Sequence, residues 1–114
     1  IYGGVDILVN AAGISLPSSN SFSNFERFSK TLNINLSSTY QCCEIASDFM
    51  LNGGSIINIT SIGSIFGFPD NPGYVASKGG VRALTKALAE DFSSKKIRVL
   101  LPMTFVIYLN NQVF

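Results

Sequence analysis

The feature that most constrains this chain is the alternation of short β-branched runs with longer segments of helical periodicity. Residues 5–9, 55–60 and 97–101 are apolar runs that read as strands. Residues 24–51 and 74–93 lie between them and repeat apolar side chains every three or four positions. Strands that alternate with helices favour a parallel sheet with right-handed crossovers. The sequence therefore predicts an α/β fold built on part of a doubly wound parallel sheet.

The first helical segment fits either one long helix or two consecutive ones, and it ends at Asn52-Gly53-Gly54. Its apolar positions are Phe25, Phe28, Leu32, Leu36, Tyr40, Cys43, Ala46, Phe49 and Met50. The second segment has an apolar face that includes Val75, Val81, Leu84, Leu88 and Phe92. Residues 15–23 and 61–73 are rich in Ser, Asn, Gly and Pro, so we expect loops there.

Charge and length exclude several classes of protein. The chain has 114 residues, enough for one small domain, and a net charge of +1 from charges scattered along it. We therefore expect no nucleic-acid partner and no membrane partner. The longest apolar run, residues 97–109, is too short and too interrupted to span a bilayer. No basic leader with a cleavage site is visible, so the expected location is the cytoplasm.

Histidine and cysteine usage narrows the chemistry. The chain has no histidine, which excludes Ser-His-Asp and Cys-His catalysis and most zinc sites, so no metal is expected. Cys42 and Cys43 are adjacent, a spacing at which a mutual disulfide is strained. We expect both to be reduced residues of a helix, with one facing the core.

Polar residues stand where two of the expected strands end. Asn10 follows the first run and Ser61 follows the second. In a parallel sheet, ligands bind beyond the carboxyl ends of the strands, and these ends share one edge. The sequence therefore predicts a binding site at that edge.

Tyr74 and Lys78 add a proton-transfer pair to this site. They are four positions apart at the start of a helix, so their side chains share a face. An ammonium near a phenol stabilises the phenolate and lowers the tyrosine pKa, which suits general acid–base chemistry. The Ser61 hydroxyl could bond a substrate oxygen, and Asn35 is a polar amide in mid-helix. Taken singly, each residue has an ordinary structural explanation, such as a cap, a turn or a solvated face.

Four elements in order resemble the classical short-chain dehydrogenase/reductase family. Asn10-Ala11-Ala12-Gly13 is similar to its Asn-Asn-Ala-Gly turn, and Asn33-Ile34-Asn35-Leu36 to the segment that carries its helix asparagine. Residues 54–61 resemble its serine strand, and Tyr74 to Lys78 matches its Tyr-x-x-x-Lys element, thirteen positions beyond Ser61. A Tyr-x-x-x-Lys element alone is common by chance, whereas four elements in order and context are specific.

The resemblance implies a Rossmann-type fold that binds NAD or NADP and transfers a hydride between the nicotinamide and a carbonyl or alcohol. It implies catalytic roles for Asn35, Ser61, Tyr74 and Lys78, and cofactor contacts from Asn10, Ala12, Gly13, Tyr74 and Lys78. Tyr74 would exchange the proton, Lys78 would lower the Tyr74 pKa and bind the ribose, and Ser61 would hold the substrate oxygen. Asn35 would order a water that relays protons to Lys78.

The chain departs from the family pattern at both ends. Only four residues precede the first strand, so the glycine-rich loop that holds the pyrophosphate is missing. The resemblance covers residues 5–99, and residues 100–114 form an atypical tail. We therefore expect one partial domain over residues 1–114. A sheet missing its first strands would expose apolar surface, so the isolated chain is expected to be marginally stable or insoluble.

Several readings stay open at this stage. The chain is either part of an oxidoreductase or a non-catalytic, truncated remnant or gene-model fragment. An extended-type relative acting on nucleotide sugars is a third reading, which the Asn-Ala-Ala-Gly element and the Ser61–Tyr74 spacing disfavour. The apolar loop at 62–72 hints at an aliphatic or acyl substrate, as for a 3-oxoacyl-acyl-carrier-protein reductase. The resemblance also implies a dimer or tetramer.

Overall fold

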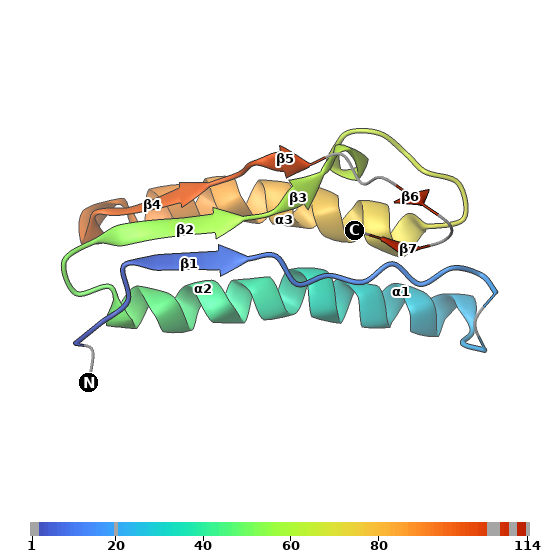
Figure 1. Cartoon of the computed structure of the whole chain (residues 1–114), viewed down its shortest axis with the longest axis horizontal. Coiled ribbons are helices and arrows are strands. Elements are labelled where there is room, and N and C mark those ends of the chain that lie inside the picture. The colour runs from blue at the N-terminus through green and yellow to red at the C-terminus, as the bar shows by residue number, and fades with distance from the viewer. Residues whose placement is uncertain (1–2, 20, 105–107, 110–111, 114) are drawn as a thin grey trace.

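The computed structural model describes residues 3–19, 21–104, 108–109 and 112–113, and its elements alternate along the chain (Figure 1). The helical elements are α1 Asn24–Leu32, the π-helical η1 Asn33–Ser37, α2 Ser38–Phe49, η2 Ile62–Ser64, α3 Pro72–Asp91 and η3 Ser93–Lys95. The strands are β1 Ile7–Asn10, β2 Gly54–Asn58, β3 Thr60–Ser61, β4 Ile97–Leu100, β5 Met103–Thr104, β6 Tyr108–Leu109 and β7 Gln112–Val113.

The main sheet has three parallel strands in the order β1-β2-β4. Leu8 lies opposite Ile56, and Ile56 lies opposite Val99, which sets the register across the sheet. Beyond it, β3 pairs in parallel with β5, so Ser61 lies opposite Thr104. This arrangement confirms the predicted α/β fold with a parallel sheet.

The helices pack against one face of this sheet and form the hydrophobic core with it. Its buried members come from α2, β2, α3 and β4 and are Cys43, Ala46, Met50, Ile56, Leu88, Phe92, Ile97 and Val99. Side chains of alternate strand positions point to the other face, where Ile7, Val9 and Leu100 are 64%, 52% and 45% exposed. In the described part of the chain, the sheet is therefore buried on one face and open on the other.

The first helical segment forms two α-helices joined by the π turn η1. A π turn takes more residues per turn than an α-helix, so it shifts the phase of the side chains that follow. The apolar positions of the sequence do not form one buried stripe. Phe25, Tyr40 and Phe49 are 76%, 45% and 57% exposed, whereas Cys43 is fully buried. Cys42 is exposed and both cysteines are free, as predicted.

Helix starts follow from local chemistry. Ser23 caps α1 in a reciprocal capping box, in which the Glu26 amide donates to Ser23 Oγ and Glu26 Oε2 accepts from the Ser23 amide. The hydrogen bonds that Glu26 Oε2 accepts from the Ser23 amide and from the Ser23 hydroxyl hold the pKa of the Glu26 carboxyl below its ordinary value. Helix α3 begins at Pro72, two residues earlier than the sequence predicts, because proline suits the first helical position.

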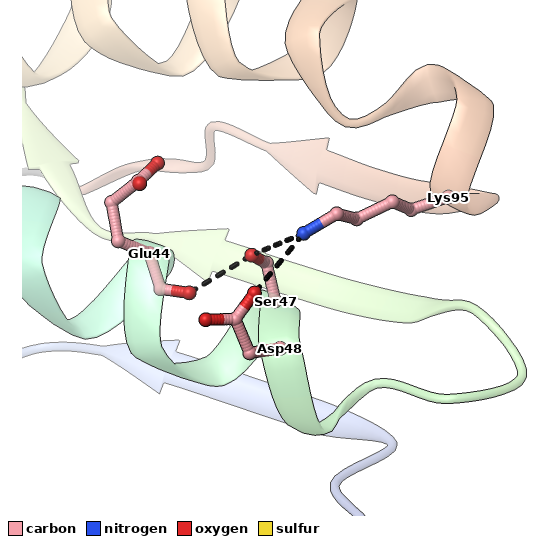
Figure 2. A network of polar contacts seen from close by, with 4 residues as sticks. All are labelled: Glu44, Ser47, Asp48 and Lys95. Atoms are coloured by element: carbon pink, nitrogen blue, oxygen red, sulfur yellow. Dashed lines mark hydrogen bonds and ion pairs between the residues drawn. The ribbon is translucent and has the colours of Figure 1, made fainter.

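The end of the domain away from the strand carboxyl ends is held by a polar contact between α2 and η3. Lys95 Nζ donates to Ser47 Oγ at 3.1 Å and lies 3.3 Å from Asp48 Oδ1. Figure 2 shows these contacts, together with the bond from Ser47 Oγ to the Glu44 carbonyl oxygen. The side chains of Lys95 and Asp48 are 45% and 75% exposed, so this is a surface contact.

The last strand of the main sheet ends at Leu100, before Pro102. The chain resumes a strand at Met103–Thr104, which the sequence analysis assigned to the atypical tail. The rest of that tail lies partly outside the described residues. Among the helices of the described segments, none combines the length and apolar character needed to cross a membrane.

Candidate active site

Ser61 lies at the carboxyl edge of the sheet, where the sequence placed the site. It belongs to β3 itself and does not follow the strand, because it pairs with Thr104 of β5. Its side chain is fully buried, and its Oγ accepts a hydrogen bond from the Gly63 amide at 3.1 Å. This bond fixes the hydroxyl oxygen while leaving the hydroxyl hydrogen to donate elsewhere.

Tyr74 occupies the first turn of α3 and is brought next to the chain that follows Ser61. Its ring is 4% exposed. A Cβ added at Gly63 would lie 2.9 Å from Phe68 Cε2 and 3.4 Å from Tyr74 Cε1. Glycine at this position therefore lets the turn after Ser61 approach the tyrosine ring closely.

Lys78 lies one helical turn after Tyr74, and its ammonium is near the tyrosine. Lys78 Nζ is 5.8 Å from the centroid of the Tyr74 ring and donates to the Ile59 carbonyl oxygen at 3.1 Å. The Thr60 hydroxyl donates to the Lys78 carbonyl oxygen at 3.1 Å, which joins helix and strand. Burial disfavours the charged ammonium and lowers the pKa of Lys78.

Asn35 lies in the π turn, and its amide connects the loop after β1 with α3. Its Nδ2 donates to the Ile14 carbonyl oxygen at 2.9 Å and to Ser77 Oγ at 3.0 Å. Its Oδ1 accepts from the Ile14 amide at 2.7 Å. Ser77 Oγ in turn donates to the Tyr74 carbonyl oxygen at 2.8 Å. The side chain of Asn35 thus fixes the loop relative to the helix turn that bears Tyr74.

The turn after β1 supplies the residues expected at a cofactor. Ala12 and Gly13 are exposed, and a Cβ at Gly13 would lie 3.4 Å from Asn35 Oδ1 and 3.6 Å from Lys78 Nζ. Asn10 points the other way, into the core. Its Nδ2 donates to Asn58 Oδ1 at 2.8 Å and to Cys43 Sγ at 3.3 Å. The structure therefore brings Gly13 to Lys78 and places the Asn10 side chain beneath the turn.

The sequence pattern did not indicate two further polar residues of this region, Asn58 and Ser77. Asn58 is fully buried, and its Nδ2 donates to Thr85 Oγ1 at 3.1 Å, so it links β1 to α3 through Asn10. Ser77 joins Asn35 to the Tyr74 turn. An amide inside a β-branched strand was the available signal for Asn58. The residue next to Lys78 gave no comparable signal.

The residues present fit NAD or NADP. Small, exposed residues in the turn give room for a flat ring beside the site. Lys78 carries three N–H donors, one of which bonds the Ile59 carbonyl oxygen. Within the described residues, no group of acidic, histidine or cysteine side chains could hold a metal ion.

Comparison with known proteins places this geometry in a family. The sequence pattern described as "short chain dehydrogenase" matches residues 1–107. A 3alpha-hydroxysteroid dehydrogenase of Mediterraneibacter gnavus is 44% identical over 102 residues, covering 86% of this chain and 40% of that protein. The 3-oxoacyl-[acyl-carrier-protein] reductase FabG of Thermotoga maritima is 34% identical over 100 residues, covering 86% of this chain and 41% of that protein.

Solved structures agree with the sequence relatives. Acetoin dehydrogenase YohF from Salmonella typhimurium has a TM-score of 0.84 and 30% identity, over 93% of this chain and 43% of that one. A gluconate 5-dehydrogenase from Burkholderia cenocepacia, in complex with NADP and tartrate, has a TM-score of 0.83 and 28% identity. The match covers 96% of this chain and 44% of that one. The chain spans about 40% of the length of the curated relatives that it matches. These matches show that the chain belongs to the short-chain dehydrogenase/reductase family, whose members use NAD or NADP.

Proposed function

We propose that this chain carries the catalytic residues of an NAD(P)-dependent oxidoreductase that interconverts a carbonyl and an alcohol. The observation that carries the proposal is the buried cluster of Ser61, Tyr74, Lys78 and Asn35 at the carboxyl edge of the sheet. Buried polar groups are retained when hydrogen bonds satisfy them, and here those bonds hold the site rigidly.

Tyr74 is the proton-transferring group in this mechanism. In reduction, its phenolic O–H donates a proton to the carbonyl oxygen of the substrate, and in oxidation the phenolate accepts the proton of the alcohol. Ser61 donates a hydrogen bond to the same substrate oxygen. The chemistry that bound NAD or NADP supplies is the transfer of a hydride to or from the substrate carbon.

Lys78 has two proposed roles, one through the charge of its ammonium and one through its N–H donors. Its ammonium, close to the Tyr74 ring, favours the phenolate. The N–H groups beyond the one given to Ile59 are suited to the hydroxyls of a ribose. Ala12 and Gly13 line the same side of the site, and Asn10 supports their turn from below.

The role proposed for Asn35 is to hold a water that relays protons to Lys78. Its side chain is engaged by Ile14 and Ser77. The water would therefore be held by the backbone carbonyl oxygen of Asn35, which also accepts from the Thr39 hydroxyl at 2.9 Å. The amide side chain then acts by positioning that carbonyl.

An apolar carbonyl compound is the proposed substrate class. Ile65 and Phe66, on the loop between Ser61 and Tyr74, are 50% and 62% exposed. The relatives include enzymes named for hydroxysteroids and for 3-oxoacyl chains, both of which are largely apolar. The proposed cofactor is NAD or NADP, because one solved relative is bound to NADP and another to NADH.

We also propose that the whole protein is a homo-oligomer in the cytoplasm. A groove between η1, α2 and α3 is lined by Leu36, Tyr40, Gly80 and Leu84. Tyr40 and Ile45 on α2 are 45% and 62% exposed, which suits burial against another copy. The free cysteines fit a reducing compartment.

The function is tested by assaying the full-length protein with NADH and NADPH against a panel of ketones that includes a 3-oxosteroid and a 3-oxoacyl thioester. The proposal expects reduction of at least one ketone, with loss of NAD(P)H absorbance matched to alcohol formed. Full-length protein that binds the cofactor but reduces none of the panel would favour the non-catalytic reading.

A further inference from the structure

A cavity of about 130 Å³ lies beside the first turn of α3, the turn that bears Tyr74. Its walls come from the loop after β1, from α1 and from the start of α3. They are formed by Leu16, Asn24, Arg27, Phe28, Thr31 and residues 70–73. Leu16, Phe28 and Pro72 give this cavity an apolar part, whereas Asn24, Thr31, Asp70 and Asn71 are polar and Arg27 is the one cation among the lining residues. An anionic group attached to an apolar body can contact both parts.

Arg27 is the cationic residue of this cavity, and its guanidinium is only partly satisfied. Its Nη2 donates to Asn24 Oδ1 at 2.6 Å, and its Nη1 donates to the Leu16 carbonyl oxygen at 3.4 Å. Both acceptors are neutral. Within the described residues, the Nε atom of Arg27 is buried and has no hydrogen-bond partner.

The charge of Arg27 also lacks a counter-charge. In the part of the chain that the structure describes, the one ion pair is that of Lys95 and Asp48, at the far end of the domain. Asp70 lines the same cavity without pairing with Arg27. Half-buried cations are normally paired, because burial removes the water that would stabilise them. A carboxylate in the cavity would supply both the counter-charge and an acceptor for the Nε–H.

The cavity is placed to hold a remote part of a substrate. Asn71, Pro72 and Gly73 form one wall and lead directly into Tyr74. Asn71 Nδ2 donates to Ser15 Oγ, which joins the loop after β1 to the start of α3. One wall of the cavity that holds Arg27 therefore belongs to the helix start that bears Tyr74.

We propose that Arg27 is a specificity-determining residue that binds a carboxylate of the substrate, which makes apolar oxo acids and hydroxy acids the preferred class. The inference rests on the proposed function, because it assumes that the carbonyl is reduced at Tyr74. A guanidinium offers Nε–H and Nη–H in a plane that matches the two oxygens of a carboxylate. Asp70 in the same wall disfavours a dianionic phosphate.

Binding is tested first, without turnover, in the full-length protein. The Arg27 Nε–H resonance, assigned with the Arg27→Gln variant, is followed by NMR as octanoate or octanamide is added. Octanoate should shift this resonance in a saturable way, and the neutral octanamide should leave it in place. The matched control Arg82→Gln should keep the octanoate response. No response to octanoate, or an equal response to both compounds, would overturn the carboxylate site.

Turnover is tested next with methyl-ketone acids of five to ten carbons and with their methyl esters. Arg27→Gln should lower kcat/KM for the best acid at least tenfold, by raising KM. The same variant should change kcat/KM for the methyl ester of that acid less than twofold. Equal effects on acid and ester would overturn the specificity role while leaving the reductase function intact. Saturable octanoate binding with no reduction of any ketone would count against the proposed function and leave the anion site standing.

Discussion

The two ends of the layer between sheet and helices are equally buried but are held together by different forces. Towards the amino ends of the strands, the contacts are apolar, with Ile56 and Leu88 at 0% and 2% exposure. Towards the carboxyl ends, Asn35, Ser61 and Ser77 are at most 1% exposed. Asn35 donates to Ser77, Ser77 donates to the Tyr74 carbonyl oxygen, and Ser61 accepts from the Gly63 amide. The first region supplies stability by burial, and the second fixes the directions of polar groups.

This difference explains why the candidate site lies where it does. Burying a polar group is costly unless its hydrogen bonds are made, so a polar core must be geometrically specific. Apolar packing tolerates small shifts, whereas the Asn35 side chain makes three hydrogen bonds that such shifts would break. The polar end is therefore the rigid frame that proton transfer requires.

The largest stability effect is expected at the apolar end. Ile56→Ala should lower the free energy of unfolding of the full-length protein by about 3 kcal/mol, because it leaves a cavity in the core. Urea unfolding measures this loss. Ile65→Ala, 50% exposed on the loop after η2, is the control and should cost clearly less. Equal losses for both variants would contradict the placement of Ile56 in the core.

A smaller loss is expected at the polar end, with a different signature. Asn35→Ala should lower the free energy of unfolding by about 2 kcal/mol, because the Ile14 backbone groups and Ser77 lose their partners. The exposed Asn33, in the same π turn, is the control. Asn33→Ala should change the free energy of unfolding by less than about 0.5 kcal/mol. Activity should fall with Asn35→Ala only. Two equal, small effects would contradict the positioning role.

Lys78 should make stability depend on pH. Burial lowers its pKa in the folded protein, whereas the unfolded chain keeps the ordinary value of 10.5. Between these pKa values the unfolded state binds more protons, so this residue makes the protein more stable as pH rises towards 10.5. The stability of the wild type relative to Lys78→Met should increase over that window. A difference between wild type and Lys78→Met that does not change with pH would refute the burial argument.

The smallest effect is expected at the surface contact of Figure 2. Lys95→Met should change the free energy of unfolding by about 0.5 kcal/mol or less, because the pair with Asp48 is exposed and screened by salt. Denaturation at low and high salt should show the difference fading as salt rises. A loss comparable to that of Ile56→Ala would mean that this contact organises the fold.

The sequence predicted the helices and strands better than the segments that connect them. The strand–helix alternation predicted the parallel sheet, and the positions of Asn10 and Ser61 at strand ends predicted one shared edge for these two residues. The π turn at 33–37 was not predictable, because apolar steps of three and four fit a continuous α-helix equally well. Tyr40 continues the apolar pattern but is 45% exposed, in the groove between α2 and α3.

Pairings between distant segments were also beyond the sequence. Asn58 bonds Asn10 and Thr85 only because the register of β1 and β2 and the position of α3 bring them together. The cavity beside Arg27 likewise depends on how α1 packs against the start of α3. Residue types and spacing indicate which chemistry is available, but contacts between elements decide which groups meet.

The most direct test of the account is the Tyr74→Phe variant of the full-length enzyme, with cofactor affinity and turnover measured on the same sample. Removing the phenolic hydroxyl should lower kcat by about 10²- to 10⁴-fold, because the proton donor is lost. Cofactor affinity should stay close to that of the wild type, and Tyr40→Phe, on the exposed face of α2, should retain both. Full turnover by Tyr74→Phe, or loss of cofactor binding together with turnover, would contradict the proton-donor role.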